Sequence, residues 1–572
     1  MILKSLYDFY NDRADKLPAI GTELKEIPYV IVIDKEGGFI RFESKRIDKR
    51  RCAAFSVAKT VGRTSAPKPN ILWDNGKYVL GLEKSHKTCH ELFVEKVREI
   101  ASRHPDDVSI QALVKFYNTP APTLLARMSE DQLYDEIKDN LSKNFSFQLE
   151  GDDCLIAEKP HLFMDISQDD DPDPKVGRCL VTGVKGPIIR TFSSTPLPGN
   201  SPMAALVSFQ VNSGYDSYNK KQAYNAPISV EAEAAITAAL KNMLDKDSKN
   251  KAYVGNRTFL FWGSGNTDIS TKVEESMAWM LTMNSQADNP DETVGKVTKL
   301  FKSIYSGQIK STLDDRFHIL GMAPCAGRIA VVMWKDTELK HFAEKIYAHF
   351  HDMEIADTRK PEDRKPYFGV YSMVSAVTRG GKLSDALPNL VEGVTDAIIN
   401  GTAYPMPLYT GALERVRNEL NDRTVTLPRA AIIKAHINRS TKNSTKHKPL
   451  QPMLDKTNDS PGYLCGRLTA VLEKIQHDTG SGDSIRTRYM GAASATPSTV
   501  FPAMLNLSIH HSEKLPNEKT KIFFEQLKQE IIDKLPVDGF PSHLDLHEQG
   551  RFFVGYYHQR ADLYTKKTNN EQ

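Results

Sequence analysis

Two stretches of the chain combine many cationic side chains with almost no acidic ones. Ser44–Trp73 holds eight Lys or Arg residues and one acid, Asp48, and Arg423–Leu454 holds seven basic residues and no acid. Clustered cations of this kind displace the counterions that are condensed on nucleic-acid phosphates. The two stretches therefore predict two local nucleic-acid-binding surfaces. The alternative for each is a solvated surface loop that contacts nothing.

The candidate contact residues fall into two groups. Base reading uses Lys, Arg or Asn side chains that a loop or hairpin presents to a groove, and Lys59, Arg63, Lys68 and Asn70 fit that description. The other basic side chains would contact the nucleic-acid backbone: Lys45, Arg46, Lys49, Arg50, Arg51, Arg429, Lys434, Arg439, Lys442, Lys446 and Lys448.

The composition of the whole chain agrees with local rather than general nucleic-acid binding. The 572 residues include 75 Lys+Arg and 72 Asp+Glu, a net charge of +3, so the chain outside the two basic stretches is net acidic. The apolar fraction of 40% is typical of a globular protein with buried cores. No run of about 18 apolar residues predicts a membrane-spanning helix, and the N-terminus lacks the pattern of a signal peptide.

Residues that could do chemistry are present, but their spacing supports no specific reaction. Ser56 and Lys59 match the Ser-x-x-Lys pattern of serine acyl enzymes without its supporting motifs. His86, Cys89 and His90 could bind zinc across one helical turn, but a fourth ligand is not visible. We therefore interpret Lys59 as part of the basic stretch and the His86–His90 segment as a helix start.

The sequence signals for metal and redox sites are equally weak. His351-Asp352 with His349 has the residue types of a metal-dependent hydrolase, and Asp165–Asp173 those of a cation-binding loop. The six cysteines form no Cys-x-x-Cys pair and predict buried free thiols. We expect no catalytic residue, metal or cofactor. The alternatives that stay open are a metal-dependent nuclease with scattered carboxylates and a scaffold that binds only proteins.

The elements that must position these residues begin with strands in residues 1–150. The apolar runs Tyr29–Asp34 and Phe39–Phe42 flank Gly37-Gly38 and predict a hairpin. Asn75-Gly76, between two further apolar runs, predicts a second hairpin with a type I′ turn. From His90 the apolar spacing becomes helical, to about residue 145.

Residues 151–422 predict a central α+β domain. Ser229–Leu244 has the pattern of a helix with Ser229 as its N-cap, and residues 271–420 are mainly helical. The expected strands are Arg178–Gly183, Ala204–Phe209, Arg257–Trp262 and Arg328–Trp334.

Residues 423–452 predict a basic linker, and residues 453–572 a helical bundle. The polar, Pro-terminated end of the linker is typical of an exposed loop, and apolar residues then recur at helical spacing in Leu464–Ile475 and Phe524–Leu535. The predicted fold class is α+β: mixed N-terminal and central domains with antiparallel strands and helices, followed by an all-α C-terminal bundle.

Several short segments stand in one order over nearly the whole chain: Met1–Tyr10, Pro28–Asp34, Lys68–Gly81, Cys179–Gly183, Leu206–Phe209, Tyr224–Pro227, Leu320–Pro324, Tyr463–Gln476, Ser494–Ser498 and Gly555–Arg560. In these segments the chain resembles one protein family, the large subunit of the type I-C CRISPR interference complex (Cascade).

The resemblance implies a non-catalytic subunit of an RNA-guided DNA-surveillance complex in antiviral defence. In such complexes the guide RNA reads the target by base pairing, and the protein reads only a short protospacer-adjacent motif in duplex DNA, as in another effector class. The implied partners are the 5′ handle of the guide RNA, the target duplex and its displaced strand, the backbone and handle-binding subunits, small-subunit copies, and a helicase-nuclease that the subunit recruits. The implied location is the cytoplasm of a prokaryote.

The resemblance also assigns roles to the candidate residues. The motif-reading role, with a part in strand separation, falls on Lys59–Asn70. Ser264 and Asn266 are second choices, because a glycine-rich turn such as Gly263–Asn266 brings backbone close to a phosphate or a groove floor.

The C-terminal bundle resembles the small subunits of related complexes, which hold the displaced strand. In type I-C systems this small subunit can arise by internal translation of the large-subunit message. A start at Met453, immediately before the bundle, would give a product of 120 residues. The alternative is an ordinary methionine.

Overall fold

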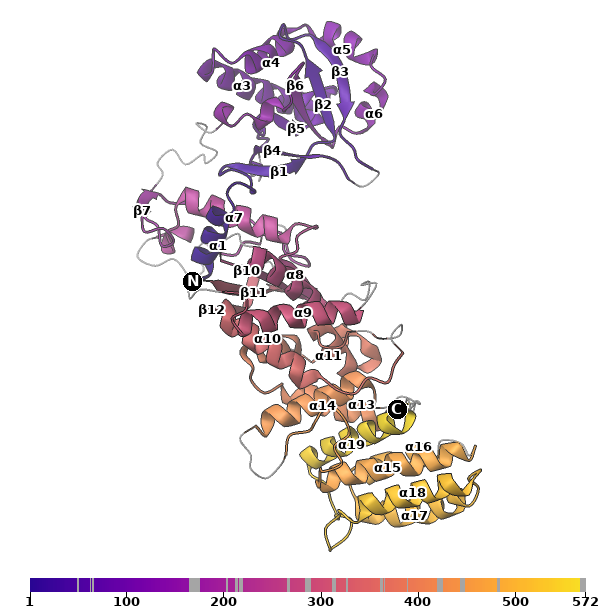
Figure 1. The fold of residues 1–572 in the computed structure, drawn as a ribbon. Coiled ribbons are helices and arrows are strands. Elements are labelled where there is room, and N and C mark those ends of the chain that lie inside the picture. Colours follow the sequence, from indigo (N-terminus) through magenta and orange to yellow (C-terminus); the bar gives the residue numbers. More distant parts are fainter. Residues whose placement is uncertain are drawn as a thin grey trace. The chain divides into compact units, whose positions relative to one another are not determined.

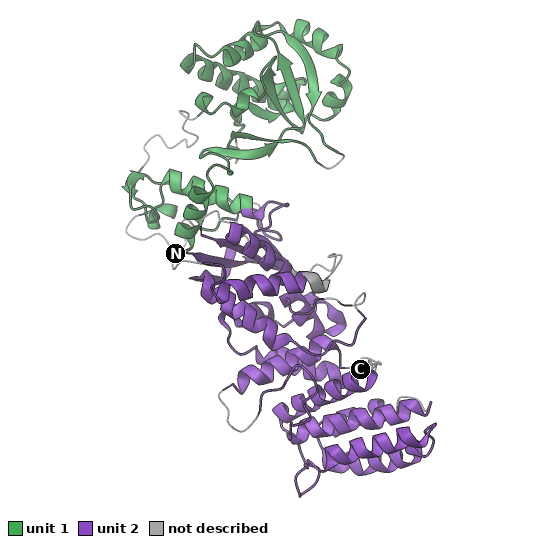
Figure 2. Ribbon diagram, in the orientation of Figure 1, with its two compact units in different colours: residues 1–195, 205–242 green, residues 196–204, 243–572 purple. Residues whose placement is uncertain are grey.

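The structure is a computed structural model that divides into two compact units (Figure 2). One unit holds residues 1–195 and 205–242, and the other holds residues 196–204 and 243–572. The predicted fold class, α+β, is confirmed, because each unit contains strands and helices and the chain ends in helices alone. The described residues are 1–48, 51–61, 63, 66–163, 175–201, 204–210, 214, 220–264, 268–282, 290–310, 315–325, 328–360, 364, 366–387, 389–418, 425–442, 448–480 and 484–565.

The first unit contains a four-stranded sheet in the order β3-β2-β6-β5 (Figure 1). All five residues of β2 (Tyr29–Ile33) are buried, as expected for a strand with no polar face. It pairs antiparallel with β3 (Phe39–Ser44) and parallel with β6 (Asn144–Leu149), and β6 pairs antiparallel with β5 (Trp73–Asn75). The hairpin predicted at Gly37-Gly38 is confirmed.

The helical stretch predicted after His90 is also confirmed. It consists of α3 (Lys87–Arg103), α4 (Val108–Asn118), α5 (Ala121–Ser129) and α6 (Tyr134–Asp139). Apolar side chains of α3 and α4, such as Phe93 and Phe116, share one core with β2 and β6. These helices therefore fix the sheet whose strand β5 follows the candidate loop, Lys59–Asn70.

The second predicted hairpin, at Asn75-Gly76, is wrong. Asn75 instead caps the short helix α2 (Gly76–Val79), because its side-chain oxygen accepts a hydrogen bond from the backbone N–H of Lys77 at 3.1 Å. Gly76 lacks the positive φ that a type I′ turn requires. Asparagine favours helix N-caps as well as turns, and here β5 finds its partner in β6 rather than in the segment that follows it.

A separate two-stranded ribbon carries the candidate loop. Its strands are β1 (Thr22–Glu26) and β4 (Ala54–Ala58), which pair antiparallel. The indole N–H of Trp73 donates to the carbonyl of Ala58 at 2.9 Å and so ties the ribbon to β5. Residues 59–70 therefore leave one fixed strand and return to another.

The rest of the first unit consists of α1 (Ile2–Asp12), the short hairpin of β7 (Val176–Arg178) and β8 (Lys185–Pro187), and α7 (Val230–Leu244). The N-cap of α7 is confirmed, because Ser229 Oγ accepts from the N–H of Ala232 at 3.3 Å. Two predicted strands are wrong. Residues 179–183 turn between β7 and β8, with Gly183 at φ 74°, and residues 204–209 make only an isolated bridge at Ala205.

The second unit begins with an antiparallel sheet in the order β12-β11-β10-β9. Its strands are β9 (Lys251–Val254), β10 (Arg257–Gly263), β11 (Arg316–Cys325) and β12 (Arg328–Glu338), and α8 (Asp268–Thr282), α9 (Pro290–Tyr305) and α10 (Leu339–Met353) share its core. The strands predicted at β10 and β12 are confirmed. The sequence reading missed β11, which contains Gly321 and Pro324, residue types that are rare in strands.

Nine further helices follow in the described residues. They are α11 (Val370–Val377), α12 (Leu390–Asn400), α13 (Met406–Asn418), α14 (Leu427–Ser440), α15 (Pro461–Asp478), α16 (Ser484–Ala493), α17 (Pro497–Ser512), α18 (Glu518–Ile532) and α19 (Leu546–Tyr564). The predicted C-terminal helices are thus present, and one apolar core continues from β9 to α19. The boundaries proposed at residues 150, 422 and 452 stay predictions.

The prediction that residues 423–452 form a basic linker is wrong for residues 427–440. These residues form α14, in which ten of the eleven positions from Leu427 to Ile437 are buried, all except Pro428. α14 packs against α13, α10 and α19. A helix that is covered on all sides belongs to a core and not to a linker.

Candidate nucleic-acid interface

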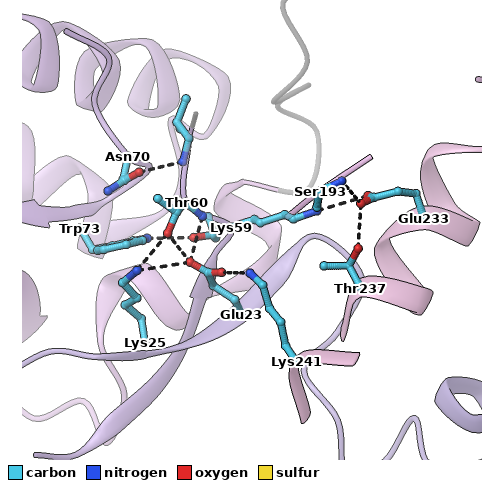
Figure 3. Close-up of polar contacts among 12 residues, drawn as sticks. Glu23, Lys25, Lys59, Thr60, Asn70, Trp73, Ser193, Glu233, Thr237 and Lys241 are labelled. Atoms are coloured by element: carbon cyan, nitrogen blue, oxygen red, sulfur yellow. Dashed lines mark hydrogen bonds and ion pairs between the residues drawn. The ribbon is translucent and has the colours of Figure 1, made fainter. Parts of the chain in front are cut away.

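Lys59 follows β4, and its ammonium group points at α7 (Figure 3). Its Nζ donates to Ser193 Oγ at 2.8 Å and lies 3.3 Å from Glu233 Oε2. Glu233 also accepts from the N–H of Ser193 at 2.9 Å and from the hydroxyl of Thr237 at 2.7 Å. Burial by itself raises the pKa of Glu233, but Lys59 and these hydrogen bonds outweigh it and hold the pKa below its ordinary value of 4.5. Lys59 therefore anchors the base of the loop.

Glu23, on β1, makes a second link between the ribbon and α7 (Figure 3). Its carboxylate lies 2.6 Å from Lys241 Nζ and accepts from the N–H of Thr60 at 3.1 Å. Burial raises the pKa of Glu23, yet Lys241, Thr60 and Lys25 together hold it below 4.5. Two carboxylates thus hold the first residues of the loop against α7.

Replacing Glu233 with glutamine should loosen the ribbon and reduce its sensitivity to acid. A carboxylate whose folded pKa is lowered stabilises the fold above its unfolded pKa and loses that contribution as the pH falls through the folded pKa. Below about pH 4.5, the protection of β4 against hydrogen exchange should therefore fall in the native chain. In Glu233→Gln it should already be lower at pH 7, by about 1–2 kcal/mol, and should change less with acid.

The matched control for that experiment is Glu91→Gln. Glu91 pairs with Lys87 at 3.8 Å, and both side chains are mostly exposed, so its loss should leave the protection of β4 unchanged. Equal protection of β4 in the native chain and in Glu233→Gln at pH 7 would contradict the anchoring role.

The two ends of the loop are joined by hydrogen bonds. Asn70 is 3% exposed, and its side-chain oxygen accepts from the N–H of Val61 at 3.0 Å. Arg63 Nε donates to the carbonyl of Lys68 at 2.7 Å. Residues 60–70, which we call the closed loop, are thus joined at their base by the Asn70–Val61 bond and nearer the tip by the Arg63–Lys68 bond.

Asp74 is the buried acid that completes this closure. It is 1% exposed, and its carboxylate pairs with the Arg63 guanidinium and accepts from the N–H groups of Asn70 and Asn75, both at 2.8 Å. Burial raises the pKa of Asp74 above its ordinary 3.8, and these partners act against that rise. The Arg63 guanidinium also lies 4.3 Å from the centre of the Tyr78 ring, so Arg63 is held from two sides.

Three of the base-reading candidates, Lys59, Arg63 and Asn70, already have partners in the structure. Lys59 contacts Ser193 and Glu233, Arg63 contacts Lys68, and the amide of Asn70 is buried. Their base-reading role stays a prediction. The described part of the tip presents Ala66 and Pro67, which are exposed, and Lys68, which is half-buried.

The backbone-contact candidates of the first basic stretch lie near acids. Lys45 Nζ lies 2.6 Å from Glu43, and Arg51 Nε lies 2.7 Å from Asp48. Arg46 lies 3.4 Å from Glu136 and 5.3 Å from the centre of the Tyr29 ring. Lys49 and Arg50 lie outside the described residues.

Three candidates of the second basic stretch are buried in α14, which removes them from the expected phosphate contacts. Arg429 and Lys434 are 7% and 2% exposed. Arg439 donates to Asp352 at 2.7 Å and to the carbonyls of Ala397 and Thr402. Burial lowers the pKa of Lys434 to about 8. Lys442 and Lys448 are exposed, and Lys446 lies outside the described residues.

The second-choice site at Gly263–Asn266 is only partly described. Ser264 accepts from the N–H of Arg316 through its Oγ at 2.8 Å and donates its own N–H to the carbonyl of Arg316 at 2.9 Å. Ser264 therefore joins β10 to the start of β11. Asn266 lies outside the described residues.

The residues that suggested chemistry have structural partners. His349 is fully buried, with Nδ1 at 2.7 Å from Tyr404 Oη and Nε2 at 2.8 Å from the carbonyl of Phe368. His90 Nδ1 lies 2.9 Å from the carbonyl of Tyr78, and Ser56 Oγ donates to Thr22 Oγ1 at 3.2 Å. None of the six cysteines forms a disulfide, as predicted, but the expectation that they are buried holds only for Cys179 and Cys465.

In the described part of the chain, no group of three or more His, Cys, Asp or Glu side chains is arranged to hold a metal ion. The predicted loop Asp165–Asp173 lies outside the described residues. Among the described helices, none is both long enough and apolar enough to span a membrane.

The residues that sequence reasoning missed are the acids of this interface. Glu23, Asp74 and Glu233 each neutralise a cation that is between 11 and 218 positions away in the chain. Asp74, the first acid after Arg63 along the chain, could have been suspected as the partner of Arg63. Nothing local marks Glu23 or Glu233.

Comparison with known proteins supplies the family. The family model described as CRISPR-associated protein (Cas_Csd1) matches residues 3–564 of the chain. The comparison with curated proteins found no match. Because the family match covers nearly the whole chain, the resemblance drawn from the sequence segments is confirmed. The chain therefore belongs to the CRISPR-associated Csd1 family, the large-subunit family of type I-C systems.

Proposed function

We propose that this chain is the non-catalytic large subunit of an RNA-guided DNA-surveillance complex in antiviral defence, and that its closed loop recognises the protospacer-adjacent motif in duplex DNA. Family membership supports the first part. The observation that carries the second is the closure of residues 60–70 through Asn70–Val61 and Arg63–Lys68. The described residues that these bonds hold lose little conformational entropy when the loop binds.

In this proposal, binding of the motif is followed by strand separation, R-loop stabilisation and recruitment of the helicase-nuclease. The chain would also contact the 5′ handle of the guide RNA and the backbone and handle-binding subunits. It would work in the cytoplasm of a prokaryote. The exposed tip of the closed loop, with Lys68, takes the reading role in place of the buried amide of Asn70.

A gel-shift selection with the guide-loaded complex tests motif reading. Target duplexes carry randomised base pairs beside the protospacer, and the bound fraction is sequenced. We expect enrichment of a short motif, and a variant with residues 64–67 replaced by four glycines should reduce that enrichment at least tenfold while guide loading stays unchanged. Unchanged enrichment in this variant would overturn the assignment to the loop.

We also propose that the C-terminal bundle is made separately as a small subunit that begins at Met453. Met453 is 68% exposed and lies between α14 and α15, so a chain that begins there interrupts no helix. α15 and α19 pack on each other more closely than any other helix pair in the described residues. The bundle therefore keeps its main internal contact in the short product.

Met453→Leu should abolish the short product and leave the full chain intact. In cells that express the chain with a C-terminal tag, immunoblotting should show both products for the native gene and at least a tenfold loss of the short one for the variant. Met490→Leu is the control, because Met490 lies inside α16. A short product that persists in Met453→Leu would contradict the internal start.

A further inference from the structure

A third basic surface, which the sequence reading did not single out, lies on α9. From Thr293 to Leu313 the chain holds Lys296, Lys299, Lys302 and Lys310 and no acid. The acids of α9 itself are Asp291 and Glu292, which precede this run. Its charge was not visible in the summed composition of the chain.

The geometry of α9 turns these lysines outward. Val297, Phe301 and Ile304 are buried in the core that α9 shares with α10, and they recur at helical spacing on one face. Lys296, Lys299 and Lys302 fall on the opposite face and are exposed. Figure 1 shows α9 and α10 side by side. The outer face of α9 is therefore a cationic strip on the second unit.

In the part of the chain that the structure describes, Lys299 and Lys302 of this strip lack the acidic partners that Lys59 and Arg63 have near the closed loop. Within the described residues, no ion pair or hydrogen bond involves the side chains of Lys299, Lys302 or Lys310. Of the two acids of α10, Glu344 lies 3.3 Å from His341 Nδ1 and 3.4 Å from Lys345 Nζ, and Asp352 pairs with Arg439. Among the described side chains, Lys299 and Lys302 therefore have no acidic partner.

Aromatic rings flank the strip. Tyr305, at the end of α9, is 43% exposed and stacks on Tyr347 of α10, with ring centres 6.2 Å apart and planes at 20°. Exposed aromatic rings beside unpaired cations are the elements with which proteins hold single strands, because bases stack on the rings while the cations follow the phosphates.

We infer that the outer face of α9, with Lys299, Lys302 and Tyr305, is a docking surface for single-stranded nucleic acid. A protein partner fits it less well, because protein interfaces have an apolar centre from which lysine is depleted, and Tyr305 is the large apolar side chain that this face exposes. The inference rests on the proposed function only in so far as that function brings single strands to the complex.

The test uses the purified full chain and fluorescein-labelled thirty-nucleotide strands, oligo-dT and oligo-U, in fluorescence anisotropy. Lys299→Glu with Lys302→Glu should weaken binding at least tenfold. Because about 0.7 counterions are released per single-strand phosphate contact, the slope of log K against log salt should decrease by about 1.4. Tyr305→Ala should weaken binding about tenfold without changing the slope. The DNA and RNA arms show which strand is preferred.

The matched control is Lys360→Glu with Lys382→Glu, which makes the same charge change at exposed lysines of the same unit. Equal loss in the control, or unchanged binding in the α9 variant, would overturn the inference. So would unchanged strand binding with impaired assembly of the complex, since that outcome indicates a protein surface. If strand binding is lost as expected while the motif selection above yields no motif, the inference stands and the proposed function fails.

Discussion

Asp74→Ala is expected to open the closed loop and to remove motif discrimination. The substitution leaves the Arg63 guanidinium without its carboxylate and the N–H groups of Asn70 and Asn75 without their acceptor. Removing one member of a buried ion pair costs about 3–5 kcal/mol. Because the Arg63 side chain is 30% exposed, we expect the lower end, about 3 kcal/mol. Urea denaturation of the full chain, followed by the fluorescence of the neighbouring Trp73, measures this loss.

The matched control is Asp48→Ala, which breaks another Asp–Arg pair of the same basic stretch. Asp48 and Arg51 are 42% and 62% exposed in their side chains, so the expected cost is below about 1 kcal/mol. In the motif selection, Asp74→Ala should flatten the enrichment at least tenfold, whereas Asp48→Ala should not. A stable Asp74→Ala chain with full discrimination would contradict the role of loop closure.

Gly466→Ala is expected to be the most damaging small substitution in the bundle. A methyl group at Gly466 would overlap the carbonyl oxygen of Phe552, and methyl groups at Gly462 and Gly555 would overlap the carbonyl oxygens of Glu548 and Tyr463. These glycines let α15 and α19 pack backbone to backbone. Forcing the helices apart costs at least about 3 kcal/mol, because the obstacle is main chain that cannot rotate away.

Gly491→Ala provides the control, because it makes the same change within α16, where an added methyl group meets nothing within 4 Å. Alanine is a better helix former than glycine, so this variant should be neutral or more stable by up to about 1 kcal/mol. Thermal unfolding of the 453–572 product and of the full chain measures both. Equal stability of the two variants would show that the α15–α19 contact is not what holds the bundle.

The sequence predicted the elements whose signals are local. The apolar run Tyr29–Ile33, the N-cap at Ser229 and the helical spacing after His90 all form the expected elements. The type I′ hairpin at Asn75-Gly76 did not form, since the same asparagine caps α2 and the pairing partner of β5 lies about seventy residues later in β6. The pairing of β5 with β6 decides whether Asn75 caps a helix or forms a hairpin turn.

The sequence indicated the candidate loop but not the contacts of its side chains. The basic residues of Lys59–Lys68 do gather in one loop, yet their partners Glu23 and Glu233 come from distant elements, so the sequence could not show that Lys59 is neutralised. In α14, basic residues spaced among Ala and Ile are buried. A count of charges alone predicts an exposed stretch, because it ignores the apolar residues that lie between the charges.

Site-specific crosslinking from the tip of the closed loop tests the central claim most directly. A photoreactive p-benzoylphenylalanine replaces Ala66, which is exposed, in the guide-loaded complex bound to a target duplex, and a second complex carries it at the exposed Val537 of the bundle. The account predicts that the Ala66 crosslinks map to the base pairs of the adjacent motif, and that the Val537 crosslinks do not. Crosslinks from Ala66 that fall elsewhere, or none when the duplex is fully bound, would contradict it.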